Sequence, residues 1–368
     1  PRPGKGEAAW GSHVLLSDRF FREATEAPVP LDLRVLRALR EQLDACSLAS
    51  KPLITEWPVR LAECLAEITP GGLECSFLCN SGSEAIDTAL KLARLHQRGK
   101  TIIAARNSFH GFTFGALSVS GVDSFRRLFE PLVPGVTFVP FGDLEALRQA
   151  AGEDTAAVLL EIVQHEAGVY LPPEGYFAEV RKLCDERGIL LIIDEIKTGF
   201  GKTGAFFACE GQGIAPDILV LGKSMGGGLI PVGAVVASSR IWKRFGLSFP
   251  MSASSYAGNV LACRAALATV DVLREEGLLA DCPGKGRLLL DGLARHAAAY
   301  PEVVESVSGI GLLIGLQVRR PRKAADLARA LIRRGILAVP AFGNPSVLMI
   351  EPPLVITREQ IGRVLNGV

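Results

Sequence analysis

The sequence predicts an α/β protein with a mostly parallel sheet and a second, smaller domain. Between about residues 58 and 275, short β-branched runs alternate with segments of helical period, which is typical of parallel strands covered by helices on both faces. After residue 260, a long helix is followed by another helix, the run "SVSGIGLLIGLQV" and the helix "KAADLARALIRRG". This succession indicates a smaller α+β domain.

The expected domains follow from this change of pattern. Residues 46–275 form the large domain and residues 276–368 the small domain. Residues 1–45 form an N-terminal segment, whose arginine-rich helix "PLDLRVLRALREQLDAC" is expected to pack with the small domain. Helices are expected at 84–97 and 175–188. The strand candidates of the large domain are "ECSFLCN", "TIIAARN", "AAVLLEIV", "GILLIIDEI", "DILVLG" and "PVGAVVAS".

Composition narrows the class of protein. The chain has 368 residues, is 48% hydrophobic, and carries 40 Lys and Arg against 39 Asp and Glu, so no global field attracts nucleic acid or an anionic membrane. Its eight cysteines show no zinc-site spacing, so we expect no metal and interpret them as reduced core residues of a cytoplasmic protein. No long apolar span or signal pattern predicts a membrane anchor or export.

Lys223 lies between an apolar run and three consecutive glycines, in "DILVLGKSMGGG". One interpretation is a phosphate-binding P-loop, but that pattern needs a glycine five residues before Gly222, where the chain has Asp217. The other interpretation is a lysine at the end of a buried strand. Its amine would be desolvated enough to act as a nucleophile and form a Schiff base.

Asp194 ends another apolar strand, in "GILLIIDEI". A buried carboxylate needs a cation or a strong donor, and a protonated pyridine nitrogen would serve; the alternative is an aspartate that caps a turn. Glycines 199, 201 and 204 match a dinucleotide-binding pattern, but they lead into "AFFACEGQG" rather than into a helix. We interpret them as a glycine-rich loop.

Ser81, Gly82 and Ser83 follow a strand and open a helix, so they form either a phosphate site or an ordinary helix cap. A cofactor with an aldehyde, a phosphate and a basic ring nitrogen would use this turn together with Asp194 and Lys223. Pyridoxal phosphate has those groups, and it is the predicted cofactor.

Several motifs occur in the order typical of one family. They are "NSGSEA", "FHG", "DEIKTGFGKTG", "APDILVLGKSMGGG", "SYAGNVLACRAA" and "IEPPLVIT". From about residue 45 onward the chain resembles the class III (subgroup II) aminotransferases, which are fold-type I pyridoxal-phosphate enzymes, and it looks most like the putrescine aminotransferase branch. The resemblance implies a seven-stranded, mostly parallel sheet in the large domain and a homodimer whose subunits share their active sites.

The resemblance also implies roles for individual residues. Lys223 would hold the cofactor and, once released by substrate, move a proton; Asp194 would keep the pyridine nitrogen protonated and Phe109 would stack on the ring. Gly82 and Ser83 would bind the phosphate of one subunit, and Ser255 of the partner subunit would reach it in place of the family's usual threonine. The implied cofactor-binding residues are Ser81, Gly82, Ser83, Phe109, His110, Asp194, Ile196, Lys197, Lys223 and Ser255.

Three departures from the family concern the substrate side. Met349 stands where an arginine often pairs with a substrate carboxylate, and a thioether cannot form that ion pair. Lys197 stands where a glutamine is usual, and could donate to the cofactor's phenolic oxygen or turn outward as a solvated charge. His165 replaces a glycine and is either structural or on the substrate side, next to Glu166, which would favour a distal ammonium.

The resemblance therefore implies a ping-pong aminotransferase that acts on small-molecule amine and carbonyl substrates. The carbonyl acceptor is expected to lack an adjacent carboxylate, and could be free or tethered to a carrier protein as an acyl chain. Two rivals remain from the sequence. The same cofactor supports a racemase, mutase or decarboxylase, and the Gly-Lys-Ser and glycine-rich matches suggest a nucleotide-binding regulatory protein.

Overall fold

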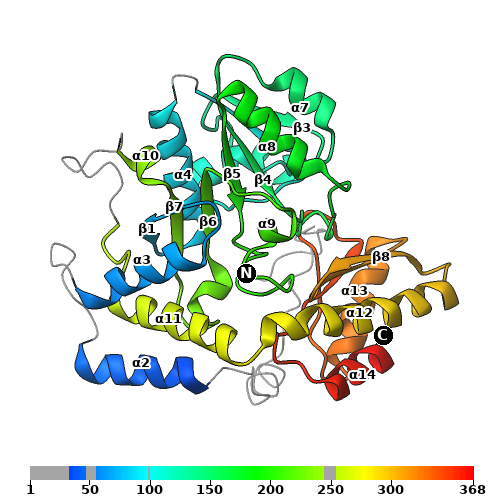
Figure 1. Cartoon of the computed structure of the whole chain (residues 1–368). Helices are drawn as coiled ribbons and strands as arrows, with labels where there is room; N and C mark the ends of the chain where they lie inside the picture. The colour runs from blue at the N-terminus through cyan, green and yellow to red at the C-terminus, as the bar shows by residue number, and fades with distance from the viewer. Residues whose placement is uncertain (1–32, 47–54, 98–99, 244–253) are drawn as a thin grey trace, which may run out of the picture.

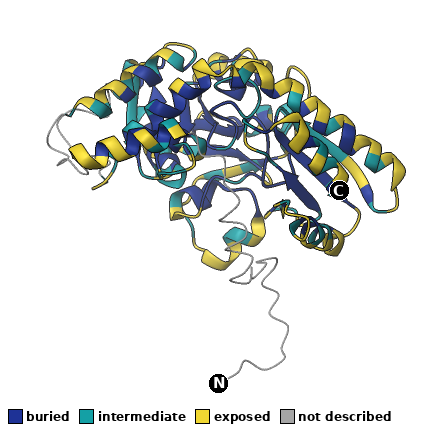
Figure 2. Cartoon of the chain, turned by 90° about the horizontal axis from the view of Figure 1, so that it is seen from below, coloured by how far each residue is buried: buried dark blue, intermediate teal, exposed yellow. Residues whose placement is uncertain are grey.

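The computed structural model describes residues 33–46, 55–97, 100–243 and 254–368. It confirms the α/β class, with a large sheet and a small antiparallel one, each packed against helices (Figure 1). None of the helices in these described ranges is both long and apolar enough to cross a membrane. Figure 2 shows the strands buried between helices whose outer faces are exposed.

The large sheet has seven strands, as the resemblance implied, and all of them run parallel except β7, which is antiparallel to both of its neighbours. In spatial order they are β1 (Cys75–Cys79), β7 (Gly233–Ala237), β6 (Ile218–Leu221), β5 (Leu190–Asp194), β4 (Thr155–Glu161), β2 (Thr101–Ala105) and β3 (Val136–Val139). All six candidate strands are therefore confirmed. The seventh, β3, is an edge strand that the search for apolar runs missed.

Helices cover both faces of this sheet, so its central strands β4, β5, β6 and β7 are buried on each side. Ile192 packs into one core and its neighbour Ile193 into the other, as alternation along a strand requires. The helices are α2 (Leu33–Ala45), α3 (Glu56–Ile68), α4 (Gly82–His96), α5 (Phe114–Val119), α6 (Asp123–Arg126), η1 (Arg127–Phe129), α7 (Leu144–Ala150), α8 (Tyr176–Arg187), α9 (Ala208–Gly211), η2 (Lys223–Gly226), α10 (Ser239–Trp242) and α11 (Val260–Glu275).

The expected packing of the N-terminal helix needs a correction. Helix α2 lies mainly against α11 rather than on the small domain, and both are at the same edge of the molecule in Figure 1. Arg34 binds Glu275 at 2.8 Å, and Arg264 binds Glu41 at 3.2 Å. An amphipathic helix shows which face it buries but not its partner, which explains the difference. Residues 1–32 lie outside the described residues.

The small domain has a four-stranded antiparallel sheet, which confirms the predicted α+β pattern. Its strands, in spatial order, are β10 (Val339–Pro340), β11 (Val347–Ile350), β9 (Leu313–Val318) and β8 (Val304–Ile310), and its helices are α12 (Leu278–Ala299), α13 (Pro321–Ile332) and α14 (Arg358–Gly367). The segment after β11 returns to the large domain: Lys202 Nζ donates to the carbonyl oxygen of Pro352 at 2.9 Å. This contact brings the end of β11 to the loops of the large sheet.

Candidate active site

The loops that follow β1, β2, β4, β5 and β6 meet at one edge of the large sheet, where the carboxyl ends of its parallel strands lie. In open α/β sheets this edge is the usual ligand site. A cavity of about 130 Å³ lies there. Its lining residues are Ser81, Gly82, Ser83, Phe109, His110, Gly111, Glu161, Val163, His165, Glu166, Asp194, Ile196, Lys197, Thr198 and Lys223.

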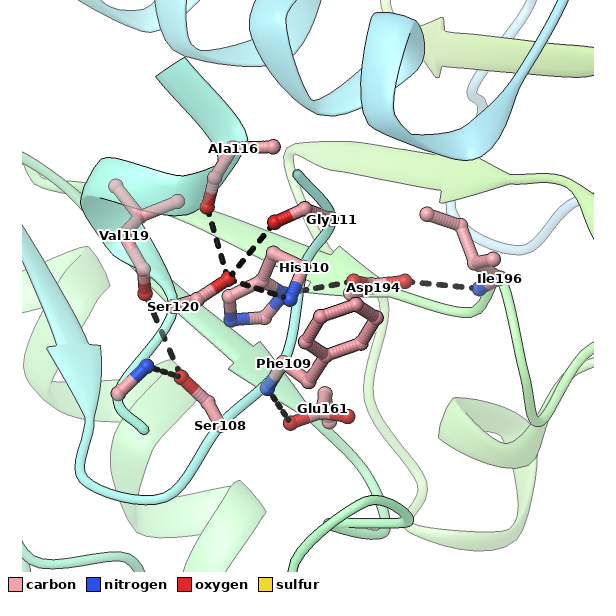
Figure 3. Close-up of polar contacts among 11 residues, drawn as sticks. Ser108, Phe109, His110, Gly111, Ala116, Val119, Ser120, Glu161, Asp194 and Ile196 are labelled. Atoms are coloured by element: carbon pink, nitrogen blue, oxygen red, sulfur yellow. Dashed lines mark hydrogen bonds and ion pairs between the residues drawn. The ribbon is translucent and has the colours of Figure 1, made fainter. Parts of the chain in front are cut away.

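Asp194 is fixed at the end of β5 by two contacts within the cavity wall. Its Oδ1 accepts from the backbone N–H of Ile196 at 2.9 Å, and its Oδ2 lies 2.7 Å from His110 Nδ1. The carboxylate and the imidazole are both buried, and Figure 3 shows the ring of Phe109 beside them. The backbone N–H of His110 donates to Ser120 Oγ at 2.9 Å, which fixes the loop that carries both aromatic rings.

Glu161 is a second buried carboxyl that the sequence interpretation assigned no role. It ends β4 directly opposite Asp194 and accepts from the backbone N–H of Phe109 at 3.2 Å (Figure 3). Burial, and then the charge of Asp194, raise the pKa of Glu161 well above its usual range. The sequence pattern that indicated Asp194 also fits Glu161, because Glu161 is an acidic residue at the end of the apolar run "AAVLLE".

Ser81, Gly82 and Ser83 border the cavity at the start of α4. Ser81 caps the helix by accepting from the backbone N–H of Glu84 at 3.2 Å. A Cβ on Gly82 would lie only 2.7 Å from Ile196 Cδ1, and one on Gly222 would lie 3.3 Å from the Cα of Gly82. The two glycines therefore let the α4 start and the β6 end approach each other closely.

Lys223 begins η2 directly after Gly222 and has a φ of 42°, which is uncommon for a residue with a side chain. Such strain persists where the surroundings fix it, often at functional sites. The side chain is accessible from the cavity. The surrounding protein still removes much of its hydration, and this desolvation, followed by the charge of Lys197, lowers the pKa of Lys223.

The substrate-side residues form a charged cluster. Lys197 Nζ donates to Glu351 Oε2 at 2.7 Å, so its ammonium pairs with a carboxylate instead of being solvated. His165 Nε2 contacts the other oxygen of Glu351, and His165 Nδ1 lies 3.1 Å from Glu166 Oε1. The sequence interpretation missed Glu351, although a charge between an apolar strand and "PPL" was a usable signal.

Two predicted residues are not among those that line this cavity. Met349 lies in β11 and packs in a buried cluster with Ala341 and Val347. Ser255 is exposed, next to Ser254, whose Oγ accepts from Asn80 Nδ2 at 2.5 Å. The predicted contact of Ser255 is with a phosphate bound in the other subunit, so the role of Ser255 stays a prediction.

A sheet of this strand order, with a strand-end aspartate and a lysine facing one cavity, defines the class of fold-type I transferases that use pyridoxal phosphate. The model of the family described as aminotransferase class-III matches residues 32–368. The chain belongs to the class-III aminotransferases, which catalyse transamination with pyridoxal phosphate. This family match does not favour the rival cofactor reactions or the nucleotide-binding protein.

Solved structures of the same kind are similar over most of this chain. An ornithine aminotransferase from Toxoplasma gondii is 30% identical, with a TM-score of 0.86, covering 91% of this chain and 80% of that one. An (S)-enantioselective omega-transaminase from Thermomicrobium roseum is also 30% identical, with a TM-score of 0.86, and the match covers 91% of this chain and 83% of that one. An acetylornithine aminotransferase from Elizabethkingia anophelis is 30% identical, with a TM-score of 0.79, and the match covers 91% of this chain and 83% of that one.

Proposed function

We propose that this aminotransferase acts on amines without a carboxylate at the reacting carbon, with a diamine as the representative donor, as in the putrescine branch. The observation that carries the proposal is the pairing of Lys197 with Glu351, because it occupies a cation that could otherwise bind a substrate carboxylate. Among the described residues that line the cavity there is no arginine. The acceptor would be an aldehyde or ketone, free or tethered to a carrier protein.

The residues present fit pyridoxal phosphate. Gly82 and Ser83 would offer the free N–H groups of the α4 start to the phosphate, and Ile196 and Phe109 would lie against the ring. Asp194 would face the pyridine nitrogen, and Lys223 would reach the aldehyde carbon. The fit rests on two facts of the structure: Gly82 and Gly222 approach each other closely beside the cavity, and the lysine that follows Gly222 lines it.

The cofactor, when bound, supplies an electron sink that stabilises negative charge on the substrate carbon. Asp194 would pair with the ring nitrogen of the cofactor, and His110 fixes the orientation of its carboxyl group. Glu161, whose pKa is raised by burial and by Asp194, adds little opposing charge. Lys223, with its lowered pKa, accepts a proton at its Nζ and returns it to the neighbouring carbon.

The substrate side favours a cationic tail over an anionic one. Glu166 lines the cavity; burial opposes its charge, but the hydrogen bond and charge of His165 act against burial and help to lower the pKa of Glu166. A carboxylate on the substrate would lie near both Glu166 and Glu351. Burying it there without a free cation would cost several kcal/mol. A distal ammonium would instead find an acceptor in Glu166.

This proposal predicts a preference that steady-state kinetics can measure. We expect kcat/KM for a diamine or a long-chain amine to exceed that for ornithine and 4-aminobutyrate by at least about tenfold, since an unpaired buried carboxylate costs more than the 1.4 kcal/mol of a tenfold difference. Glu166→Gln should reduce the diamine value and leave a monoamine of equal length nearly unchanged. A clear preference for either amino acid would overturn the proposal.

Part of the proposal concerns assembly and location. The loop that carries Phe109 and His110 continues into Phe112 and Phe114, whose side chains are 58% and 63% exposed in the single chain. Large exposed apolar side chains beside a site are typical of a protein interface. We propose that this loop is covered in a homodimer, where Ser255 of the partner subunit reaches the phosphate. The thiols of Cys64, Cys75, Cys184, Cys209, Cys263 and Cys282 are free, which supports a cytoplasmic location.

The dimer can be tested with a matched pair of variants. Light scattering should give the mass of two chains for the unchanged protein, and Phe114→Asp should shift it towards one chain and weaken cofactor binding, because a charge is placed in an apolar interface. Leu337, which is 67% exposed on the small domain, gives the control Leu337→Asp, expected to remain dimeric. A monomeric unchanged protein with full activity would contradict the shared site.

A further inference from the structure

Glu351 connects the small domain to two basic side chains of the large domain. It follows β11 directly, and its two carboxylate oxygens contact Lys197, from the loop after β5, and His165, from the loop after β4. The second nitrogen of His165 faces Glu166 at 3.1 Å. Two carboxylates and two basic groups thus form a chain of contacts along the substrate side of the cavity.

This arrangement holds the Lys197 ammonium in place. The side chains of Lys197 and Glu351 are only 24% and 18% exposed. Burial opposes the charge of Glu351, but the hydrogen bond and charge of His165 and then the Lys197 ammonium outweigh it and lower the pKa of Glu351 to about 2. Glu351 is therefore a carboxylate across the whole working pH range, and Lys197 keeps its partner.

Lys197 and Lys223 line the same cavity. Four charged or titratable groups act on Lys223 from the elements around it. After desolvation, the Lys197 charge is the largest influence on the pKa of Lys223 and lowers it, whereas Glu166, Asp194 and Glu161 act in the opposite direction. Glu161 has the smallest influence of these three on the pKa of Lys223. Among these four groups, Lys197 is the one whose charge has the same sign as a Lys223 ammonium.

We propose that Lys197, tethered by Glu351, is a positioning residue that acts through Lys223: its fixed positive charge disfavours a second ammonium and keeps the Lys223 amine neutral. An amine next to another cation is available as a nucleophile and a base at a lower pH than desolvation alone allows. The inference rests on the proposed role of Lys223. This role differs from the two alternatives that the sequence left for Lys197, a solvated charge and a hydrogen-bond donor to the cofactor.

The test measures the protonation of Lys223 directly. The full chain is loaded with pyridoxamine phosphate, which has no aldehyde, so that Lys223 is a free amine. Its acylation by acetic anhydride is followed against pH by peptide mass spectrometry. We expect Lys197→Gln to move the midpoint of Lys223 labelling upward by about one pH unit, because removing a nearby like charge makes the ammonium less unfavourable. Labelling at a fixed pH below the midpoint should fall about tenfold.

Two further variants separate charge from structure. Lys197→Arg keeps the charge and should keep the midpoint. Lys182→Gln removes an exposed lysine of α8 that lines neither cavity beside Lys223, and should also leave the midpoint unchanged. Equal midpoints in Lys197→Gln and the unchanged protein, or an equal shift in Lys197→Arg, would overturn the inference. Its failure is distinct from that of the proposed function, since retained turnover in Lys223→Ala would instead remove Lys223 from the mechanism.

Discussion

Replacing Lys223 by alanine is expected to leave a folded protein that binds pyridoxal phosphate without a covalent link and has lost transamination. The main-chain contacts at Gly82 and Ser83 and the aspartate at the ring nitrogen would remain, while the amine that forms the link and moves the proton would be gone. The loss should be several orders of magnitude, because two functions disappear with one side chain. Alanine carries a Cβ as lysine does, so the backbone strain at a φ of 42° should be unchanged, and thermal unfolding checks that the variant is folded.

Borohydride reduction followed by mass spectrometry gives the readout. The unchanged protein should gain the reduced cofactor on the peptide that contains Lys223, and the variant should gain none while still showing bound cofactor by absorbance. Lys202→Ala is the matched control. Lys202 and Lys223 both border an adjoining cavity of about 490 Å³, but of these two lysines only Lys223 also lines the site at the sheet edge. Turnover near the original rate in Lys223→Ala would exclude this lysine as the catalytic residue.

Replacing Asp194 by alanine is expected to reduce transamination by several orders of magnitude while disturbing dimer formation little. Without the carboxylate the pyridine nitrogen loses its proton near neutral pH, and negative charge on the substrate carbon loses its sink. His110 would keep its backbone contact with Ser120 but lose its partner at Nδ1. Single-turnover rates, followed through the cofactor absorbance, measure this effect directly.

Asp194→Asn separates charge from packing. Its amide oxygen can still accept from the Ile196 N–H, so the strand end should keep its shape, yet the negative charge is absent. We expect Asn and Ala to be impaired to a similar degree. If either variant exchanged amine and ketone at a rate comparable to the unchanged protein, Asp194 would not be the partner of the ring nitrogen.

The sequence predicted those parts of the structure that local patterns determine. A parallel strand buried on both faces appears as an unbroken apolar run, as in β4 and β5, and the polar residue that ends it falls at the ligand-binding edge. This is why Asp194 and Lys223 could be found. Strand β3 was missed because it is short, lies at the edge of the sheet and is largely half-exposed, so its run is weak.

Contacts between distant residues could not be predicted in this way. Lys197 and Glu351 are 154 residues apart and belong to different parts of the fold, so their ion pair depends on how the segment after β11 returns to the large sheet. The sequence left Lys197 with two alternatives, and neither included this partner. The packing of α2 on α11 was misjudged for the same reason, since an apolar face does not identify the surface that covers it.

The close approach of Gly82 to Gly222 has a consequence for how this enzyme can change. At the cofactor end of the cavity, a side chain added at Gly82 or Gly222 would press against its neighbours. At the other end, the side chain of Glu166 is the one proposed to meet the distal group of the substrate. Replacement of Glu166 can therefore alter which amine is accepted while the two glycines and Lys223 stay as they are. A lineage can diversify in substrate range at this position without first losing its chemistry.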